Sequence, residues 1–153
     1  MGWFTRKNKN IVTPTDQKKE TPDGLWHKTP SGKIVDKDNL EQNSWVSVED
    51  GYHFKIGSKE YFSIIFDDNK FTELDADMTA KYPLKFTDTK SYQKRLEASQ
   101  KKSNLKDAVR TAYGKTTGQP IVVACMDFAF IGGSMGSVVG EKIARAIDYA
   151  IKN

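Results

Sequence analysis

The chain has 153 residues, of which 37% are hydrophobic and 29% are charged, and its formal net charge is +4. A chain of this length buries roughly 68–70% of its unfolded surface, so it can form a hydrophobic core without disulfides. The single cysteine, Cys125, excludes an intramolecular disulfide and a metal site made of cysteines alone. No apolar run approaches the roughly 20 residues that span a bilayer, and the first residues lack the apolar segment of a secretory signal. We therefore expect a cytoplasmic protein without a membrane partner.

The positive charge is concentrated in one short segment. Residues 90–110 carry seven basic and two acidic side chains, whereas the rest of the chain carries 17 basic and 18 acidic ones. Two interpretations stay open: a solvated helix face, which charge runs usually form, or a local site for a phosphate-bearing ligand or a nucleic acid. The basic residues concerned are Lys90, Lys94, Arg95, Lys101, Lys102, Lys106 and Arg110.

The N-terminal third predicts little regular structure. Residues 1–24 are rich in Lys, Asn, Thr and Pro without a periodic apolar pattern, which is typical of a flexible arm. Residues 25–57 read as turns and short extended pieces that form a small module with little room for a core. We expect four aromatic side chains to hold it together, namely Trp26, Trp45, Tyr52 and Phe54.

Two helices are predicted in the middle of the chain. Ser58 is a plausible N-cap for a helix that runs to Phe66, and a connector follows as far as Pro83. Asp88 or Thr89 could cap a second helix that reaches about residue 102. This helix would place Tyr92, Leu96 and Ser99 inward. Five carboxylates of the connector match no calcium loop and are interpreted as solvated surface: Asp67, Asp68, Glu73, Asp75 and Asp77.

The C-terminal third predicts α/β structure. Residues 108–113 read as a strand, 114–120 as a turn and 121–128 as a buried strand. A glycine-rich turn follows, and then a helix runs to the end with an apolar stripe formed by Val138, Val139, Ile143, Ala146, Ile147, Ala150 and Ile151. Such an apolar strand normally lies inside a sheet that is covered on both faces. Because no further strand follows the helix, we expect the sequence to be the front portion of a longer protein.

The glycine-rich turn is the strongest candidate for a ligand site. It consists of Gly132, Gly133, Ser134, Met135 and Gly136. Glycines let a ligand approach the backbone closely, and the N–H groups at the start of the next helix favour an anion or a polarised carbonyl. A purely structural strand-to-helix turn explains the glycines equally well. The spacing fits neither the dinucleotide nor the phosphate-loop pattern. His27, His53 and Cys125 are interpreted as surface or structural residues.

Residues 127–142, with the sequence DFAFIGGSMGSVVGEK, resemble the hallmark of the β subunit of the acetyl-CoA carboxylase carboxyltransferase. The segments PLKFTDTKSY at 83–92 and LKDA at 105–108 are similar to the same family, as are MGWF at 1–4 and DGLW at 23–26. The resemblance implies that residues 25–57 are a degenerate zinc-ribbon-like module. It also implies that residues 58–153 are the truncated front of a crotonase-like ββα spiral fold.

The family commonly carries a four-cysteine zinc ribbon at this place. The matching positions here hold Thr29, Gly32, Ser47 and Asp50, which cannot supply four thiolates. We therefore expect no zinc.

The resemblance implies transfer of a carboxyl group from carboxybiotin on a carrier protein to acetyl-CoA, which yields malonyl-CoA for fatty acid biosynthesis. No cofactor is expected to bind this chain directly. The implied partners are the carboxyltransferase α subunit in an α2β2 assembly, the biotin carboxyl carrier protein and biotin carboxylase. Gly132 to Gly136 would line the CoA side, and the main oxyanion-hole residues are expected beyond Asn153, so that this chain alone is expected to be inactive.

Two alternatives stay open. The chain could serve another short acyl-CoA, or it could be a basic nucleic-acid-binding module. The modest charge and the lack of interleaved aromatic and basic residues argue against the second alternative.

Overall fold

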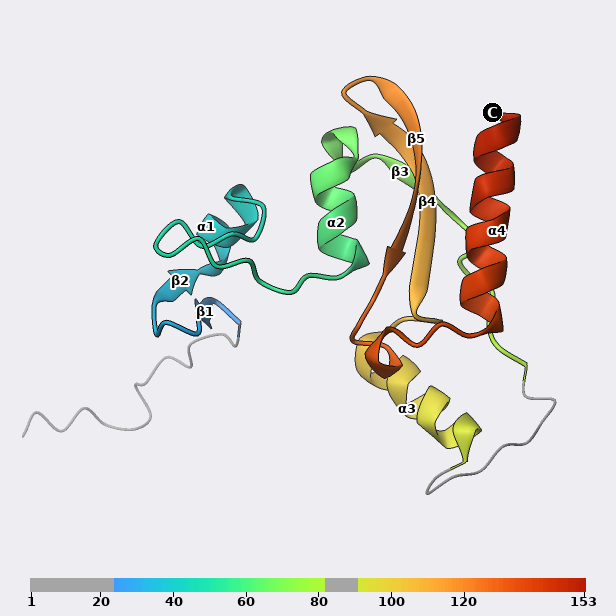
Figure 1. Ribbon diagram of the computed structural model, residues 1–153, viewed down its shortest axis with the longest axis horizontal. Helices are drawn as coiled ribbons and strands as arrows, with labels where there is room; N and C mark the ends of the chain where they lie inside the picture. Colours follow the sequence, from blue (N-terminus) through green and yellow to red (C-terminus); the bar gives the residue numbers. More distant parts are fainter. Residues whose placement is uncertain (1–23, 82–90) are drawn as a thin grey trace, which may run out of the picture. The chain divides into compact units, whose positions relative to one another are not determined.

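The computed structural model describes residues 24–81 and 91–153. The chain divides into two units between His53 and Phe54, and each is described by itself (Figure 1). Residues 1–23 of the arm predicted at 1–24 lie outside the described residues, as do Lys90 and the proposed caps Asp88 and Thr89.

The first unit contains a short hairpin followed by one helix. Strand β1 (Trp26–Lys28) pairs antiparallel with β2 (Ile34–Asp36), with His27 opposite Val35. Helix α1 (Lys37–Gln42) is absent from the predicted elements, although Asp36 is a standard N-cap whose carboxylate accepts the N–H of Asn39 at 2.9 Å. A helix of six residues is too short for a clear apolar period, and this explains why it escaped prediction.

The four aromatic side chains do not hold this unit together, and that prediction is wrong. Trp26 is 60% exposed and Tyr52 is also exposed, while Phe54 belongs to the second unit. Trp45 is half-buried and meets the ring of His27 edge-on at 5.7 Å. The buried side chains are smaller ones, Val35, Leu40, Thr29 and Ser47, because a module of this size has no room to enclose indole rings.

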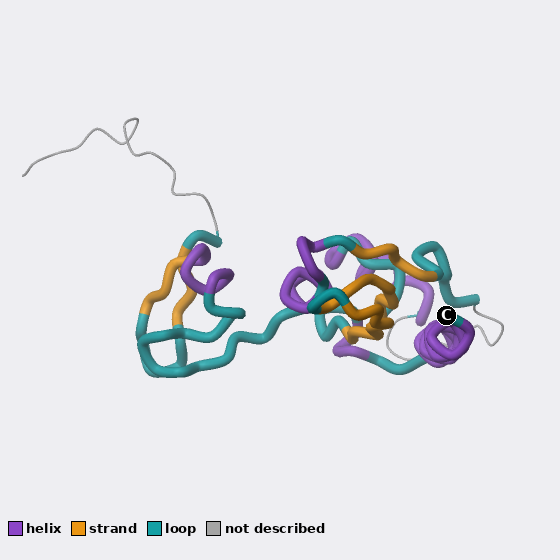
Figure 2. Tube along the Cα trace, turned by 90° about the horizontal axis from the view of Figure 1, so that it is seen from above, coloured by secondary structure: helices purple, strands orange, loops and turns teal. Residues whose placement is uncertain are grey.

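The second unit is a three-stranded antiparallel sheet with helices. Its strands are β3 (Phe71–Leu74), β4 (Val109–Thr116) and β5 (Gln119–Met126), in the order β3-β4-β5. Its helices are α2 (Ser58–Ile65), α3 (Tyr92–Ser103) and α4 (Ser137–Lys152), with short 3-10 turns η2 (Asp67–Asn69) and η3 (Ile131–Gly133). Figure 2 shows the strands between the helices of this unit.

The mixed α/β content is confirmed, but several local predictions need correction. Strands β4 and β5 form a tight hairpin, so residues 114–116 and 119–120 belong to strands and not to a turn. Thr117 and Gly118 make the turn with φ values of 49° and 80°, as two-residue hairpins require. Strand β3 lies in the predicted connector. Strand β5 has only one strand neighbour among the described residues, so its predicted position inside the sheet is not observed, although α2 and α4 contact its two faces.

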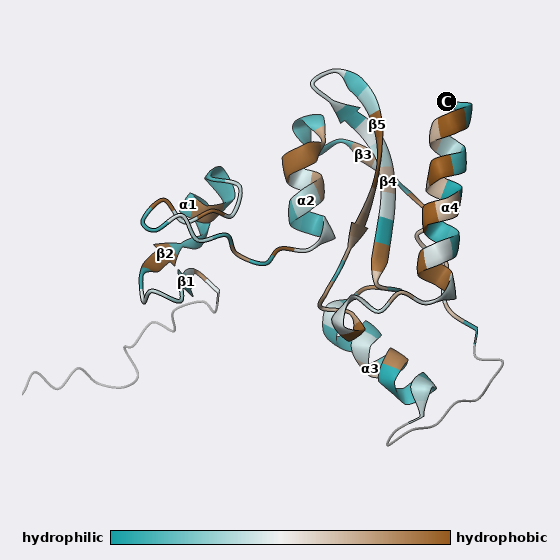
Figure 3. Cartoon of the chain, in the orientation of Figure 1, coloured by the Kyte–Doolittle hydropathy of each residue, from teal (hydrophilic) through white to brown (hydrophobic). Residues whose placement is uncertain are grey.

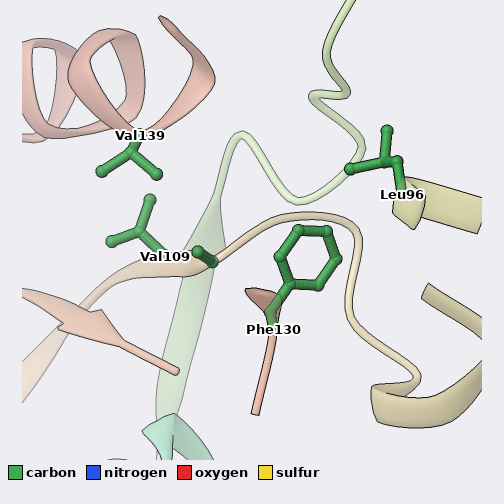
Figure 4. Packing of buried hydrophobic residues seen from close by; sticks show 5 residues of the cluster. Leu96, Val109, Phe130 and Val139 are labelled. Carbon is green, nitrogen blue, oxygen red and sulfur yellow. The ribbon is translucent and has the colours of Figure 1, made fainter. Parts of the chain in front are cut away.

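Two core clusters lie on opposite faces of the sheet, because side chains alternate along β4. On one face, Ala112 and Cys125 pack with Phe62 and Phe66 of α2. The other face carries Val109 in a cluster with Val139 of α4, Leu96 of α3, Ala108 and Phe130. Figure 4 shows Phe130 between Val109 and Leu96, with Val139 facing Val109. Figure 1 likewise shows α2 and α4 on the two sides of β4 and β5.

Helix α4 only partly follows its predicted apolar stripe. Val138, Val139 and Ala146 are buried, but Ile147 and Ile151 are 55% and 77% exposed. Figure 3 shows hydrophobic residues recurring along this helix up to its C-terminal end. Within residues 24–81 and 91–153, no helix is both long and apolar enough to cross a membrane.

Candidate functional site

The glycine-rich segment forms a compact turn between β5 and α4. Ile131, Gly132 and Gly133 all have positive φ, at 43°, 65° and 73°, a region that glycine adopts without strain. Gly136 is the N-cap of α4, and no side chain caps this end of the helix. The start of α4 therefore presents backbone N–H groups without a side-chain partner, a feature compatible with an anion or a carbonyl oxygen.

The turn is anchored on one side and open on the other. Phe130 is 2% exposed in the core, and the N–H of Gly133 donates to the Phe130 carbonyl at 2.9 Å. A Cβ on Gly133 would lie 3.0 Å from the Phe128 ring, and the φ of 73° favours glycine at this position. Met135 is 74% exposed, and Ser134 and Gly136 are also exposed. The open side is the part available to a ligand.

Helix α3 is tied to this turn. The hydroxyl of Ser99 accepts the N–H of Ile131 at 3.3 Å, which confirms the inward position predicted for Ser99. Leu96 is buried as predicted, whereas Tyr92 lies at the surface. The N-cap is Ser91, whose hydroxyl accepts the N–H of Lys94. The basic helix and the candidate turn are therefore neighbours.

The basic segment does not act as one patch. Five of its side chains are exposed, namely Lys94, Arg95, Lys101, Lys102 and Lys106. Arg110 instead lies on β4 and binds Glu73 of β3 through two hydrogen bonds of 3.1 and 2.6 Å. Its guanidinium also donates to the Ser58 hydroxyl at 3.3 Å and lies 5.0 Å from the centre of the Phe62 ring. Arg110 therefore has a structural role, because its guanidinium contacts β3 and α2.

The same geometry corrects the interpretation as plain solvated surface for Asp67, Glu73 and Asp75, whereas Asp68 and Asp77 are exposed as predicted. Glu73 and Asp75 are half-buried, and Asp75 pairs with Arg145 of α4 at 3.2 Å. The carboxylate of Asp67 accepts the N–H groups of Thr117 and Gly118, each at 2.8 Å. These carboxylates hold the sheet, its hairpin turn and α4 together.

Asp127, which follows β5, joins the candidate turn to α2 and was not singled out from the sequence. Its Oδ1 accepts the N–H of Ser58 at 2.8 Å, while Oδ2 is buried without a hydrogen-bond partner. The N-cap of α2 is Gly57 and not Ser58, and the Glu60 carboxylate accepts the Gly57 N–H at 2.9 Å. The only sequence signal for Asp127 was a carboxylate directly after an apolar strand.

Two surface cavities border the segment that precedes the turn. One, of about 650 Å³, is lined by charged residues that include Glu73, Asp107, Arg110, Asp127 and Lys142. The other, of about 630 Å³, is lined by more apolar residues, among them Phe54, Tyr61, Met126 and Phe128. Both cavities reach Ala129, but Gly132 to Gly136 line neither of them. The structure therefore places the predicted turn beside these cavities and not inside them.

Two buried ionisable groups face the charged cavity. Burial raises the pKa of Asp107 and lowers that of Lys142, whose charges partly compensate each other. Lys142 is 1% exposed, and its ammonium donates to the Val109 carbonyl at 3.4 Å. Cys125 behaves as the buried apolar residue that the sequence predicts, because burial raises the pKa of its thiol to about 11.

The positions that match the family's zinc ligands do not fit a zinc ion. Thr29, Ser47 and Asp50 lie near one another in the first unit, whereas Gly32 has no side chain. One carboxylate and two hydroxyls lack the four nitrogen or sulfur donors of a structural zinc site. Among the described residues, no group of three His, Cys, Asp or Glu side chains could hold a metal ion.

Comparison with known proteins identifies the family. The chain is 65% identical over its whole length to the acetyl-coenzyme A carboxylase carboxyl transferase subunit beta of Christiangramia forsetii, and 61% identical to that of Flavobacterium psychrophilum. It is 47% identical over 99% of its length to the Chlorobaculum tepidum protein of that name. In each case it covers 54% of the relative, so it spans about half the length of the curated relatives it matches. A model of the carboxyl transferase domain family matches residues 60–153, and the chain therefore belongs to that family.

Proposed function

We propose that this chain acts in the β subunit of the acetyl-CoA carboxylase carboxyltransferase. That enzyme moves the carboxyl group of carboxybiotin to acetyl-CoA and forms malonyl-CoA. The proposal rests on one observation above all: residues 60–153 match the carboxyl transferase domain, and 65% identity extends across both units. The sheet and helices of the second unit would then be the beginning of a crotonase-like ββα spiral.

The turn from Gly132 to Gly136 is proposed to line the CoA side of the site. Its positive-φ glycines give close access to the backbone, and the uncapped start of α4 favours a polarised oxygen or a phosphate. The reaction passes through an enolate, and one backbone N–H donor to such an oxyanion contributes about 3–4 kcal/mol. The main donors are proposed to lie outside this chain, whose own residues shape and position the CoA ester.

The exposed basic residues of α3 are proposed to attract the CoA phosphates. Ser99 ties α3 to the turn, so Lys101 and Lys102 lie on the helix that contacts the proposed site. These lysines also occupy the last turn of α3, where basic side chains stabilise the helix dipole. Reversing both charges to Glu would lower the affinity for CoA at low salt and leave it nearly unchanged at high salt if they steer the ligand.

The partners and cofactors follow from the same proposal. Biotin would act on the carrier protein and not on this chain, and the α subunit would contribute the biotin side of an α2β2 assembly. Biotin carboxylase would supply carboxybiotin, in the cytoplasm. The first unit would hold no zinc, because its donor atoms do not suit that ion.

The test is an assay of the β subunit that carries this sequence, combined with the α subunit and the carboxylated carrier protein. Malonyl-CoA formation from acetyl-CoA supports the proposal, and preferential use of propionyl-CoA would assign the chain to another short acyl-CoA. No carboxylation of either substrate, together with a mobility shift of nucleic acid at physiological salt, would contradict it.

The role of the turn needs a separate experiment. Met135→Ala removes an exposed side chain of the turn, and Ile151→Ala removes a similarly exposed one from the far end of α4. We expect Met135→Ala to raise KM for acetyl-CoA roughly threefold or more with kcat unchanged, and Ile151→Ala to leave both unchanged. Equal kinetics in the two variants would show that the turn does not touch the substrate.

A further inference from the structure

In the first unit, two loops come together at the positions that match the zinc ligands. One loop spans residues 29–33 between β1 and β2, and the other spans residues 47–52 after α1. Thr29 and Ser47 are 2% and 0% exposed, so polar side chains fill the space between the loops. A buried polar group needs hydrogen bonds to offset its lost hydration. The Thr29 hydroxyl has them, whereas the Ser47 hydroxyl has no hydrogen-bond partner in the described part of the chain.

The side chains of Thr29, Ser31 and Asp50 form a chain of hydrogen bonds. The N–H of Lys33 donates to the Thr29 hydroxyl at 3.2 Å, and this hydroxyl lies 2.9 Å from that of Ser31. The Ser31 hydroxyl donates to the Asp50 carboxylate, which lies 19 positions later in the chain. Asp50 also accepts the N–H of Tyr52 at 3.2 Å. The chain therefore starts on the backbone of one loop and ends on the backbone of the other.

The charge of Asp50 suits this role. The hydrogen bond from the Ser31 hydroxyl holds the pKa of its carboxyl well below the usual range. At neutral pH the group is therefore an acceptor only, and hydrogen bonds to a charged acceptor are stronger than those between neutral groups. Ser31 is not one of the four matched positions. Ser31 provides the hydrogen-bonding side chain that Gly32, the neighbouring matched position, lacks.

We propose that the Ser31–Asp50 contact and the neighbouring hydroxyl of Thr29 form a metal-independent clasp that fastens the two loops. The clasp does with oxygen atoms what four thiolates and a metal do in a ribbon with cysteines. Its closure requires neither a metal nor a reduced thiol. The inference concerns how the unit is held together and does not rest on the proposed enzymatic function.

The test is amide hydrogen exchange in the intact chain, with each variant read in the opposite loop. Asp50→Ala is read at the amides of Thr29 and Gly32, which donate to backbone carbonyls of the first loop. Ser31→Ala is read at the amides of Ser47 and Gly51, which do so in the second. We expect exchange about threefold to tenfold faster in both cases, as the loss of one such hydrogen bond implies.

Two controls complete the experiment. Glu49→Ala removes the exposed carboxylate next to Asp50, which is not part of the clasp. This variant should change the amide exchange rates of both loops by less than about twofold. The Ser31→Ala/Asp50→Ala double variant should exchange little faster than either single one, because both residues act through one contact. Acceleration confined to the mutated loop would overturn the proposal. Faster exchange in the unaltered chain after addition of a zinc chelator would overturn it equally.

Discussion

The carboxylate of Asp127 accepts the N–H of Ser58 at 2.8 Å, although the two residues are 69 positions apart. This bond fixes the start of α2 against the end of β5, directly before the glycine-rich turn. It also explains Gly57, because a Cβ there would lie 2.4 Å from Oδ1 of Asp127. The latch between Asp127 and α2 thus needs a carboxylate at one position and the absence of a side chain at the other.

Replacing Asp127 should weaken this latch. Asp127→Ala leaves the N–H of Ser58 without its acceptor, and we expect the free energy of unfolding to fall by about 1–2 kcal/mol. Gly57→Ala should also destabilise, since its Cβ must displace a buried carboxylate. The Gly57→Ala penalty should shrink in the Asp127→Ala background, where the clashing group is gone. Urea unfolding of the four proteins measures this, and additive effects would show that Gly57 and Asp127 are independent.

Arg110 should not tolerate conversion to lysine. The guanidinium binds both oxygens of Glu73 and also contacts Ser58 and Phe62, whereas a lysine ammonium can make only part of these contacts. We expect Arg110→Lys to cost about 1–2 kcal/mol of stability. Arg95→Lys on the exposed side of α3 is the matched control and should stay within about 0.5 kcal/mol of the natural chain. A similar effect of both substitutions would mean that the clamp on Glu73 is unimportant.

Two glycine-to-alanine substitutions should change the stability of the chain in opposite directions. A Cβ on Gly114 of β4 would lie 2.6 Å from the Phe66 ring and 2.7 Å from the Lys70 carbonyl, so Gly114→Ala should destabilise by about 2–3 kcal/mol. Gly140 lies inside α4 with nothing within 4 Å of the added atom. Gly140→Ala should therefore stabilise by about 0.5–1 kcal/mol. Thermal unfolding distinguishes them, and a loss of stability with Gly140→Ala would reveal a contact of that helix surface.

Cys125 should react slowly and only at high pH. Burial raises its pKa from the usual 9.0 to about 11, so near pH 8 the thiolate is about 100-fold rarer than in an unfolded chain. Alkylation followed by mass spectrometry should show at least this difference between native and urea-unfolded protein. Because the folded pKa is the higher one, the contribution of Cys125 to stability is complete below pH 9 and is lost as the pH rises toward 11. Rapid alkylation of the native chain at pH 8 would disprove the burial.

Elements with a strong local pattern could be predicted from the sequence. The spacing of Phe62 and Phe66 and the apolar start of α4 gave both helices close to their observed bounds. Residues 114–116 were assigned to a turn because Gly114 looks like a turn residue, whereas it actually lets β4 pass beside Phe66. The exposed Ile147 and Ile151 show that periodicity indicates an apolar face without saying what covers it.

The candidate site depends on contacts between distant residues, and these carry no local signal. Glycines at 132 and 133 pointed to the turn, but nothing near Asp127 in sequence indicates that it binds Ser58. The Arg110–Glu73 pair spans 37 positions, so both residues looked like parts of separate charged segments. Ser31 was not predicted because Gly32, the residue beside it, is the one that matches a zinc-ligand position.

The hydrogen bond between the Ser99 hydroxyl and the Ile131 N–H links a solvent-facing helix to the backbone of the turn. Two segments joined in this way share their fluctuations, and thermodynamic linkage makes such sharing reciprocal. A molecule that binds and orders the turn would stabilise the last turns of α3 against fraying. By the same amount of free energy, an ordered α3 would strengthen the binding of that molecule. The surface helix would then report occupancy of the turn without contacting the occupant.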